Sequence, residues 1–79
     1  MTNKEKYQEV FINSLSLEKQ KFNSNLKYNE IPEWDSIGHM SLISGLEDAF
    51  KITIETEDII DFSSYLKGQE ILKKYKVEI

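Results

Sequence analysis

The chain has 79 residues, 39% of them apolar and 30% charged, which is the composition of one small globular domain spanning residues 1–79. It has no cysteine and one histidine, which excludes a disulfide framework and argues against a structural zinc site. The net charge is −4, and residues 33–61 hold eight acidic side chains and one lysine. This acidic middle repels the phosphates of nucleic acid. It is either a solvated face that keeps the protein soluble or a surface for a basic protein partner.

The first ten residues lack the apolar stretch of a signal peptide, and no apolar run approaches the ~20 residues of a membrane span. We therefore expect a cytoplasmic monomer with no membrane partner.

The first predicted helix covers residues 3–15. Thr2 and Glu5 have the spacing of a capping box, which satisfies two backbone donors at the start of a helix. One apolar face follows at helical spacing, made by Tyr7, Val10, Phe11 and Leu15.

Residues 16–35 form a long predicted loop, with one helical turn at residues 17–21. Such a loop needs anchors in a small domain. Its apolar side chains supply them: Leu17, Phe22, Leu26, Tyr28, Ile31 and Trp34.

The second predicted helix covers residues 36–50. Its apolar stripe contains His39, Ile43, Leu46 and Phe50. Another stripe has only small or acidic members, namely Gly38, Ser41, Gly45 and Asp48. This stripe is either a tolerated imperfection on a solvent face or a face that another surface approaches closely.

Residues 51–55 alternate in polarity but have no partner strand, so we predict a loop with Ile52 and Ile54 pointing inward. A short helix over residues 56–61 and a last helix over residues 64–75 complete the chain. The fold class is all-α, a small bundle of three main helices plus one short helix.

Ser36 has three interpretations. It can cap the helix, as can Asp35. It can be a nucleophile activated by His39, although the chain lacks a G-x-S-x-G elbow and is small for enclosing a substrate. It can also be a covalent attachment point, because a helix N-terminus favours a phosphate.

The stretch DSIGHMSLISGLEDAF resembles the attachment helix of acyl carrier proteins, whose usual motif is Asp-Ser-Leu where this chain has Asp-Ser-Ile. The resemblance covers nearly the whole chain, because the order of the helices and the long loop with apolar anchors also match. The segment EWDSIGHM is similar to stand-alone carriers of specialised pathways.

The resemblance implies that Ser36 carries a phosphopantetheine arm, that Asp35 is its motif neighbour, and that a phosphopantetheinyl transferase takes the arm from coenzyme A. The arm's thiol would hold acyl cargo as a thioester, so the chain itself would not be an enzyme. Acyl-loading ligases or synthases with basic docking patches would be its partners.

Two further sets of residues follow from the resemblance. In the family, acidic residues of the second and third helices dock partner enzymes. The residues of this chain that fit this role are Glu47, Asp48, Glu55, Glu57 and Asp58. The residues that would line an acyl pocket are Met40, Leu46, Ile54 and Ile59, which could equally serve only to pack the core. Phe62 and Tyr65 are bulky near that region and would narrow the pocket toward short or polar cargo.

The family carries more acids early in this helix, where this chain has Gly38, Ser41 and Ser44, a face that suits a dedicated partner. The alternative function is an unmodified helical interaction module that uses the same acidic face.

Overall fold

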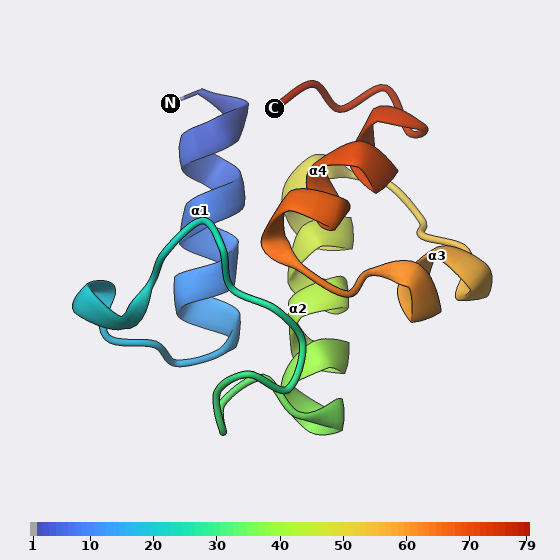
Figure 1. The fold of residues 1–79 in the computed structure, drawn as a ribbon. Helices are drawn as coiled ribbons and strands as arrows, with labels where there is room; N and C mark the ends of the chain where they lie inside the picture. Colours follow the sequence, from blue (N-terminus) through green and yellow to red (C-terminus); the bar gives the residue numbers. More distant parts are fainter. Residues whose placement is uncertain (1) are drawn as a thin grey trace.

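A computed structural model describes residues 2–79 and contains α-helices joined by loops (Figure 1). The helices are α1 (Asn3–Ser14), α2 (Ser36–Phe50), α3 (Thr56–Asp61) and α4 (Tyr65–Lys73), with a 3-10 turn η1 (Lys19–Lys21) after α1. Within residues 2–79 the only β-type pairing is an isolated bridge between Lys27 and Ser64. The predicted all-α bundle of three longer helices and one short helix is confirmed.

Helix α1 begins with the predicted capping box. The Glu5 N–H donates to Thr2 Oγ1 and the Thr2 N–H donates to Glu5 Oε1, each at 3.1 Å. The helix ends at Ser14, one residue before the predicted end, because Ser16 adopts a left-handed φ of 53°. This turn directs the buried side chains of Leu15 and Leu17 toward the core.

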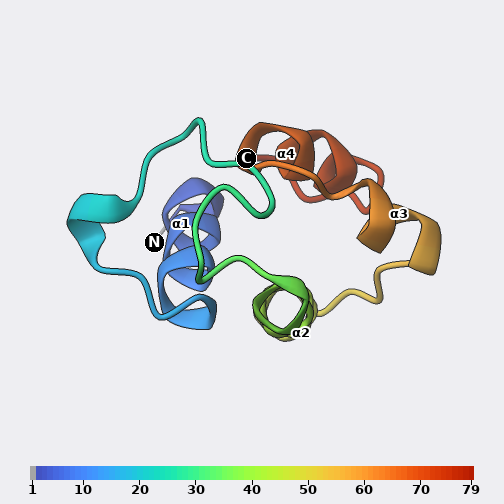
Figure 2. The ribbon, with the colours of Figure 1, turned by 60° about the horizontal axis from the view of Figure 1, so that its bottom comes forward.

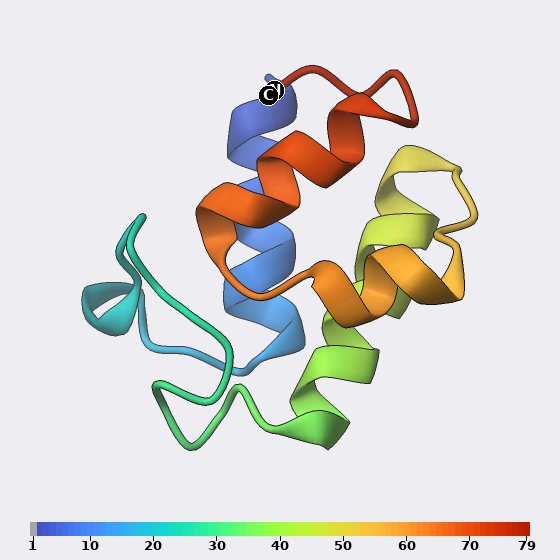
Figure 3. The same cartoon turned by 45° about the vertical axis from the view of Figure 1, so that its right-hand side comes forward.

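Helices α1 and α2 lie side by side, and α4 lies across one side of the pair with α3 at the edge (Figures 2 and 3). Gly45 of α2 makes the close approach to α1 possible, because a Cβ at this position would lie 2.6 Å from Ser14 Oγ. A Cβ on Gly38 would overlap the Glu33 carbonyl oxygen in the segment before α2 and would lie 3.1 Å from a Leu15 methyl carbon. The glycines of the small-residue stripe therefore serve contacts within this chain, and only Ser41 and Asp48 of that stripe are exposed.

The core is centred on the ring of Phe11, which is completely buried. Its centroid lies 5.0 Å from that of Tyr7, 5.1 Å from Tyr65 and 5.2 Å from Trp34, all in edge-to-face geometry with Phe11. Such pairs contribute about 0.5–1.5 kcal/mol each beyond the burial of their area. One residue of α1 thus joins the start of α4 and the segment that precedes α2.

The long loop is fixed to the junction between α3 and α4. The Tyr28 N–H donates to the Ser63 carbonyl at 2.8 Å, and the Tyr65 N–H donates to the Leu26 carbonyl at 2.9 Å. Leu17, Leu26 and Trp34 are buried as predicted. Tyr28 was expected to be an apolar anchor but is 41% exposed, because its backbone bond to Ser63 holds it at the surface beside α3.

The connection from α2 to α3 is the predicted loop. Lys51 ends α2 with a left-handed φ of 56°, and the chain then turns the Ile54 side chain into the core while Ile52 is partly buried.

Helix α4 begins after its cap Ser64, whose hydroxyl oxygen accepts the Lys67 N–H at 2.9 Å. It ends at Lys73, two residues earlier than predicted, and the chain then returns to the start of α1 (Figure 1). There the Asn3 side-chain amide donates to the Glu78 carbonyl at 3.0 Å. The two ends of the described chain therefore lie together.

Gly68 of α4 tests how tightly this core is packed. A Cβ at this position would overlap Phe62 Cζ and Tyr7 Oη, and both rings are held by full burial. Gly68→Ala should lower the Tm, because overpacking costs about 1–3 kcal/mol of stability. In a domain of this size, each kcal/mol lost lowers the Tm by about 4–8 °C. Helix propensity alone favours Ala over Gly by about 1 kcal/mol, so a raised Tm would show that the packing is loose. Lys67→Ala, one residue earlier and exposed, is the control.

Candidate functional site

Ser36 is the first residue of α2, and Asp35 rather than Ser36 caps the helix. Asp35 Oδ1 accepts the Gly38 N–H at 2.8 Å, and the Asp35 carbonyl accepts the His39 N–H at 2.8 Å. Ser36 is exposed, and its hydroxyl makes no hydrogen bond within residues 2–79. The capping role therefore belongs to Asp35 and leaves the Ser36 hydroxyl free.

The start of α2 is also electrostatically suited to a phosphate. The first backbone N–H groups of a helix have no partner inside it, and the aligned peptide dipoles place partial positive charge there. Only the Gly38 N–H is taken by the cap. A phosphodiester on Ser36 would therefore meet a helix N-terminus that attracts it.

A shallow groove runs along α2 from Ser36, lined by Ser36, Ile37, Met40, Ser41 and Ser44. Two of these residues are apolar and exposed, Ile37 by 79% and Met40 by 52%. Met40 was predicted to line an acyl pocket. Its side chain lies in this open groove, because the packing of α2 against α1 turns it outward.

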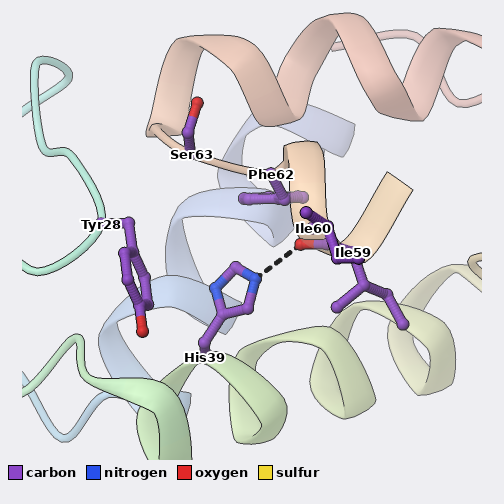
Figure 4. Close-up of a pocket in the computed structure, with 6 residues that line it drawn as sticks. All are labelled: Tyr28, His39, Ile59, Ile60, Phe62 and Ser63. Atoms are coloured by element: carbon purple, nitrogen blue, oxygen red, sulfur yellow. Dashed lines mark hydrogen bonds between the residues drawn. The ribbon is translucent and has the colours of Figure 1, made fainter. Parts of the chain in front are cut away.

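A separate pocket of about 270 Å³ lies between α2, α3 and the long loop (Figure 4). Six residues line it: Tyr28, His39, Ile59, Ile60, Phe62 and Ser63. In Figure 4 the His39 ring lies between Tyr28 on one side and Ile59 on the other, with Phe62 above it.

The residues predicted to line or narrow an acyl pocket lie in different surroundings. Ile59 and Phe62 line the pocket, whereas Leu46 and Ile54 are buried in the core away from it. Tyr65 does not narrow the pocket, because its ring packs against Tyr7 with centroids 4.7 Å apart.

Four of the lining residues were not predicted as such from the sequence: Tyr28, His39, Ile60 and Ser63. For His39 a signal was present, since it lies one helical turn after Ser36.

The hydrogen bonds of His39 assign its tautomer. The indole Trp34 Nε1–H donates to His39 Nδ1 at 2.9 Å, and an indole can only donate. Nδ1 therefore bears a lone pair, and Nε2–H donates to the Ile59 carbonyl at 2.8 Å. Both ring nitrogens are occupied in a neutral imidazole, which leaves none to activate Ser36 as a nucleophile.

The acidic residues predicted for docking fall into two groups. Asp48, Glu55 and Glu57 are exposed, as is Asp61, which was not predicted. Glu47 is only half-exposed, and its Oε2 accepts the Ile54 N–H at 2.8 Å. Glu47 therefore stabilises the loop after α2, which is a structural role in place of the expected free surface charge.

Asp58 is buried, so its predicted place on the docking surface is wrong. Its Oδ1 lies 2.6 Å from Lys74 Nζ, and its Oδ2 accepts the Tyr75 hydroxyl at 2.5 Å. The Tyr75 oxygen in turn accepts the Glu55 N–H at 2.9 Å. The hydrogen bonds from Lys74 and Tyr75 hold the pKa of Asp58 below its ordinary value, while the bond to Asp58 raises the pKa of Lys74. This cluster joins α3 to the end of α4.

Comparisons with protein-family models, curated proteins and solved structures gave no match. The candidate site is therefore defined by its own residues and geometry. No helix in the described chain has the length and apolar character to cross a membrane. Among residues 2–79, no three or more histidine, aspartate or glutamate side chains gather as a metal site would require.

The different roles of Asp35 and Ser36 predict different costs of substitution. Asp35→Ala removes the side-chain cap, which costs about 1 kcal/mol and should lower the Tm by roughly 4–8 °C. Ser36→Ala removes an exposed hydroxyl without a partner, so stability should change by about 0.5 kcal/mol or less. Thermal melting of both variants checks this, and a larger loss for Ser36→Ala would reverse the assignment of the cap.

The Asp58 cluster predicts how stability depends on pH. The folded-state pKa of Asp58 is lowered. Its contribution to the free energy of unfolding is therefore complete above its unfolded-state pKa near 4 and is lost as the pH falls through its folded-state pKa. The Tm of Asp58→Asn should be below that of the wild type at neutral pH, and the gap should narrow as the pH falls from about 5 to about 3.

Glu57→Gln, an exposed neighbour in α3, is the control for this experiment. Both variants retain Glu5 and Glu33, whose pKa values are also lowered, in each case first by a backbone hydrogen bond. Parallel pH profiles for Asp58→Asn and the wild type would contradict the stabilising role of the Asp58 cluster.

Proposed function

We propose that this chain is a carrier protein of the acyl carrier type, which holds an acyl or related group as a thioester on a phosphopantetheine arm attached to Ser36. The observation that carries the proposal is the exposed, unpartnered Ser36 hydroxyl at the start of α2, next to an Asp35 that already caps the helix. An attached group at this point would leave the capping of α2 intact.

The residues around Ser36 fit the arm. Its phosphate would lie near the uncapped N–H groups of α2, and the groove lined by Ile37 and Met40 gives apolar surface next to it. The arm, when attached, supplies the thiol that this cysteine-free chain lacks. The Ser36 oxygen would form the phosphodiester while the nucleotide part of coenzyme A leaves, a step performed by a separate transferase.

The chain would then act as a substrate for partner enzymes and would not catalyse the transfers itself. Exposed acids on α2, on α3 and in the loop between them suit enzymes with basic docking surfaces, such as the transferase and an acyl-loading ligase or synthase. The exposed apolar residues Ile37, Met40 and Ile60 add contact area on the same helices. Among the predicted docking residues, Asp48, Glu55 and Glu57 remain candidates because they are exposed.

The proposal is tested by incubating the chain with coenzyme A and a transferase of broad specificity. The wild type should gain the mass of one phosphopantetheine group, and peptide mapping should place it on Ser36. Ser36→Ala should melt like the wild type and gain nothing. A Ser36→Ala protein that still gains the arm, or a folded wild type that never does, would overturn the assignment.

The exposed apolar residues also favour a second function, an unmodified interaction module that binds a basic partner through α2 and α3. If the chain is such a module, the wild type and the Ser36→Ala variant should bind the partner with equal affinity. A carrier needs the serine for activity even where docking is retained.

Charge reversal should separate docking from folding. Asp48→Lys combined with Glu57→Lys should slow arm transfer, most strongly at low salt where surface charges are least screened. Both residues are exposed, so each substitution should change stability by about 0.5 kcal/mol or less. Glu9→Lys on α1, also exposed, is the control and should leave the rate unchanged. Equal rates for the double variant and this control would place the docking surface elsewhere.

A further inference from the structure

The pocket between α2, α3 and the long loop has walls that are held in place before any ligand binds. The neutral His39 ring forms its floor and is bonded on both sides, to Trp34 and to the Ile59 carbonyl. The ring of Tyr28 stands edge-on to His39 with centroids 5.2 Å apart, and Phe62 does so at 5.9 Å. Backbone bonding of Tyr28 to Ser63 fixes the side formed by the loop.

The size of the pocket limits what it can hold. Its volume is about 270 Å³. An apolar cavity of roughly 150 Å³ accommodates one benzene molecule, and pockets for larger organic ligands begin near about 300 Å³. This pocket therefore has room for one ring or a short chain, with little space beyond it.

The lining also limits the charge of a ligand. The six lining residues include no lysine or arginine, and both ring nitrogens of His39 are already bonded. The remaining polar groups of the lining side chains are the uncharged hydroxyls of Tyr28 and Ser63. A carboxylate that entered would lose its hydration without gaining an ionic partner, which is strongly unfavourable. Exposed Glu57 and Asp61, which flank the lining residues in the sequence of α3, would repel it further.

We infer that this pocket holds an uncharged part of an acyl group, about the size of a four-carbon chain or a single aromatic ring. The inference rests on the proposed function, since a tethered arm is what brings an acyl group to the pocket. A longer chain would place its first carbons in the pocket and leave the rest in solvent. Terminally carboxylated acyl groups would remain outside.

The test uses the full chain carrying Ser36→Ala, so that no arm can be attached and the result does not depend on modification. Thioesters of N-acetylcysteamine with butyric, succinic, benzoic and octanoic acids are titrated into the isotope-labelled protein to millimolar concentration. Backbone amide shifts of residues 59–63 report binding, and those of residues 4–13 in α1 are the reference.

The butyryl and benzoyl probes should give saturable shifts at residues 59–63. The succinyl probe, which has the same number of carbons as butyryl, should give none. The octanoyl probe should bind within about threefold of butyryl, whereas full burial of its chain would strengthen binding about fourfold for each added methylene. Equal binding of succinyl and butyryl, stepwise tightening with chain length, or no saturable shift for either uncharged probe would each overturn the inference.

A pair of variants locates the binding. Tyr28→Ala removes one ring wall but keeps the backbone bond to Ser63, and should weaken benzoyl binding about three- to tenfold. Leu66→Ala removes an exposed apolar side chain of α4 outside the pocket and should leave binding unchanged. Thermal melting shows that both variants fold. Unchanged benzoyl affinity in Tyr28→Ala would move the site away from this pocket.

These outcomes are separate from the test of the proposed function. A chain that accepts the arm on Ser36 but binds succinyl as well as butyryl would remain a carrier with a different cargo. A chain that binds the uncharged probes but never accepts the arm would have a small-molecule pocket without being a carrier.

Discussion

The neutral imidazole of His39 joins three parts of the chain that come together only in the folded state. It accepts a hydrogen bond from Trp34 in the segment before α2, it belongs to α2, and it donates to the Ile59 carbonyl of α3. Through Trp34 this connection reaches Phe11 and the aromatic core, and through Ile59 it fixes a wall of the pocket. The helix that starts at Ser36 is therefore held by the core behind it and by α3 in front. His39, which the sequence offers as one possible partner for a nucleophilic Ser36, instead connects the core to α3 through its two ring nitrogens.

The same positioning of α3 divides its acidic residues between structure and surface. Asp58 is turned inward, where Lys74 and Tyr75 compensate for the cost of burying its charge, while Glu55, Glu57 and Asp61 stay exposed. In α2, Glu47 is bonded to the following loop and Asp48 is free. The number of acidic residues in the sequence therefore overstates the negative charge that a basic partner can reach, because Asp58 and Glu47 are bonded within the fold.

Much of the fold could be predicted from local signals. The bounds of α2 and α3 match the prediction, and for α2 the local signals are the Asp35 cap and the apolar residues at helical spacing. The same local signal identified Ser36 as the first helical residue. The end of α4 could not be predicted in this way, since Tyr75 leaves the helix to bond Asp58 and Glu55, residues distant in sequence. The pocket lining was missed for a similar reason: Met40 and His39 are neighbours on α2, and only the packing of α1, α3 and the loop decides which of them faces outward.

Trp34 is the only tryptophan of the chain, is fully buried, and donates its indole proton to the ring that forms the pocket floor. Its emission would therefore respond to changes at His39 with no competing signal from another indole. Any event that moves α3 or rotates His39 alters the hydrogen bond of this fluorophore, whereas events on the distant face of α1 do not reach it directly. The chain thus contains an intrinsic optical probe next to its pocket, and movements of that region can be followed in the unlabelled protein.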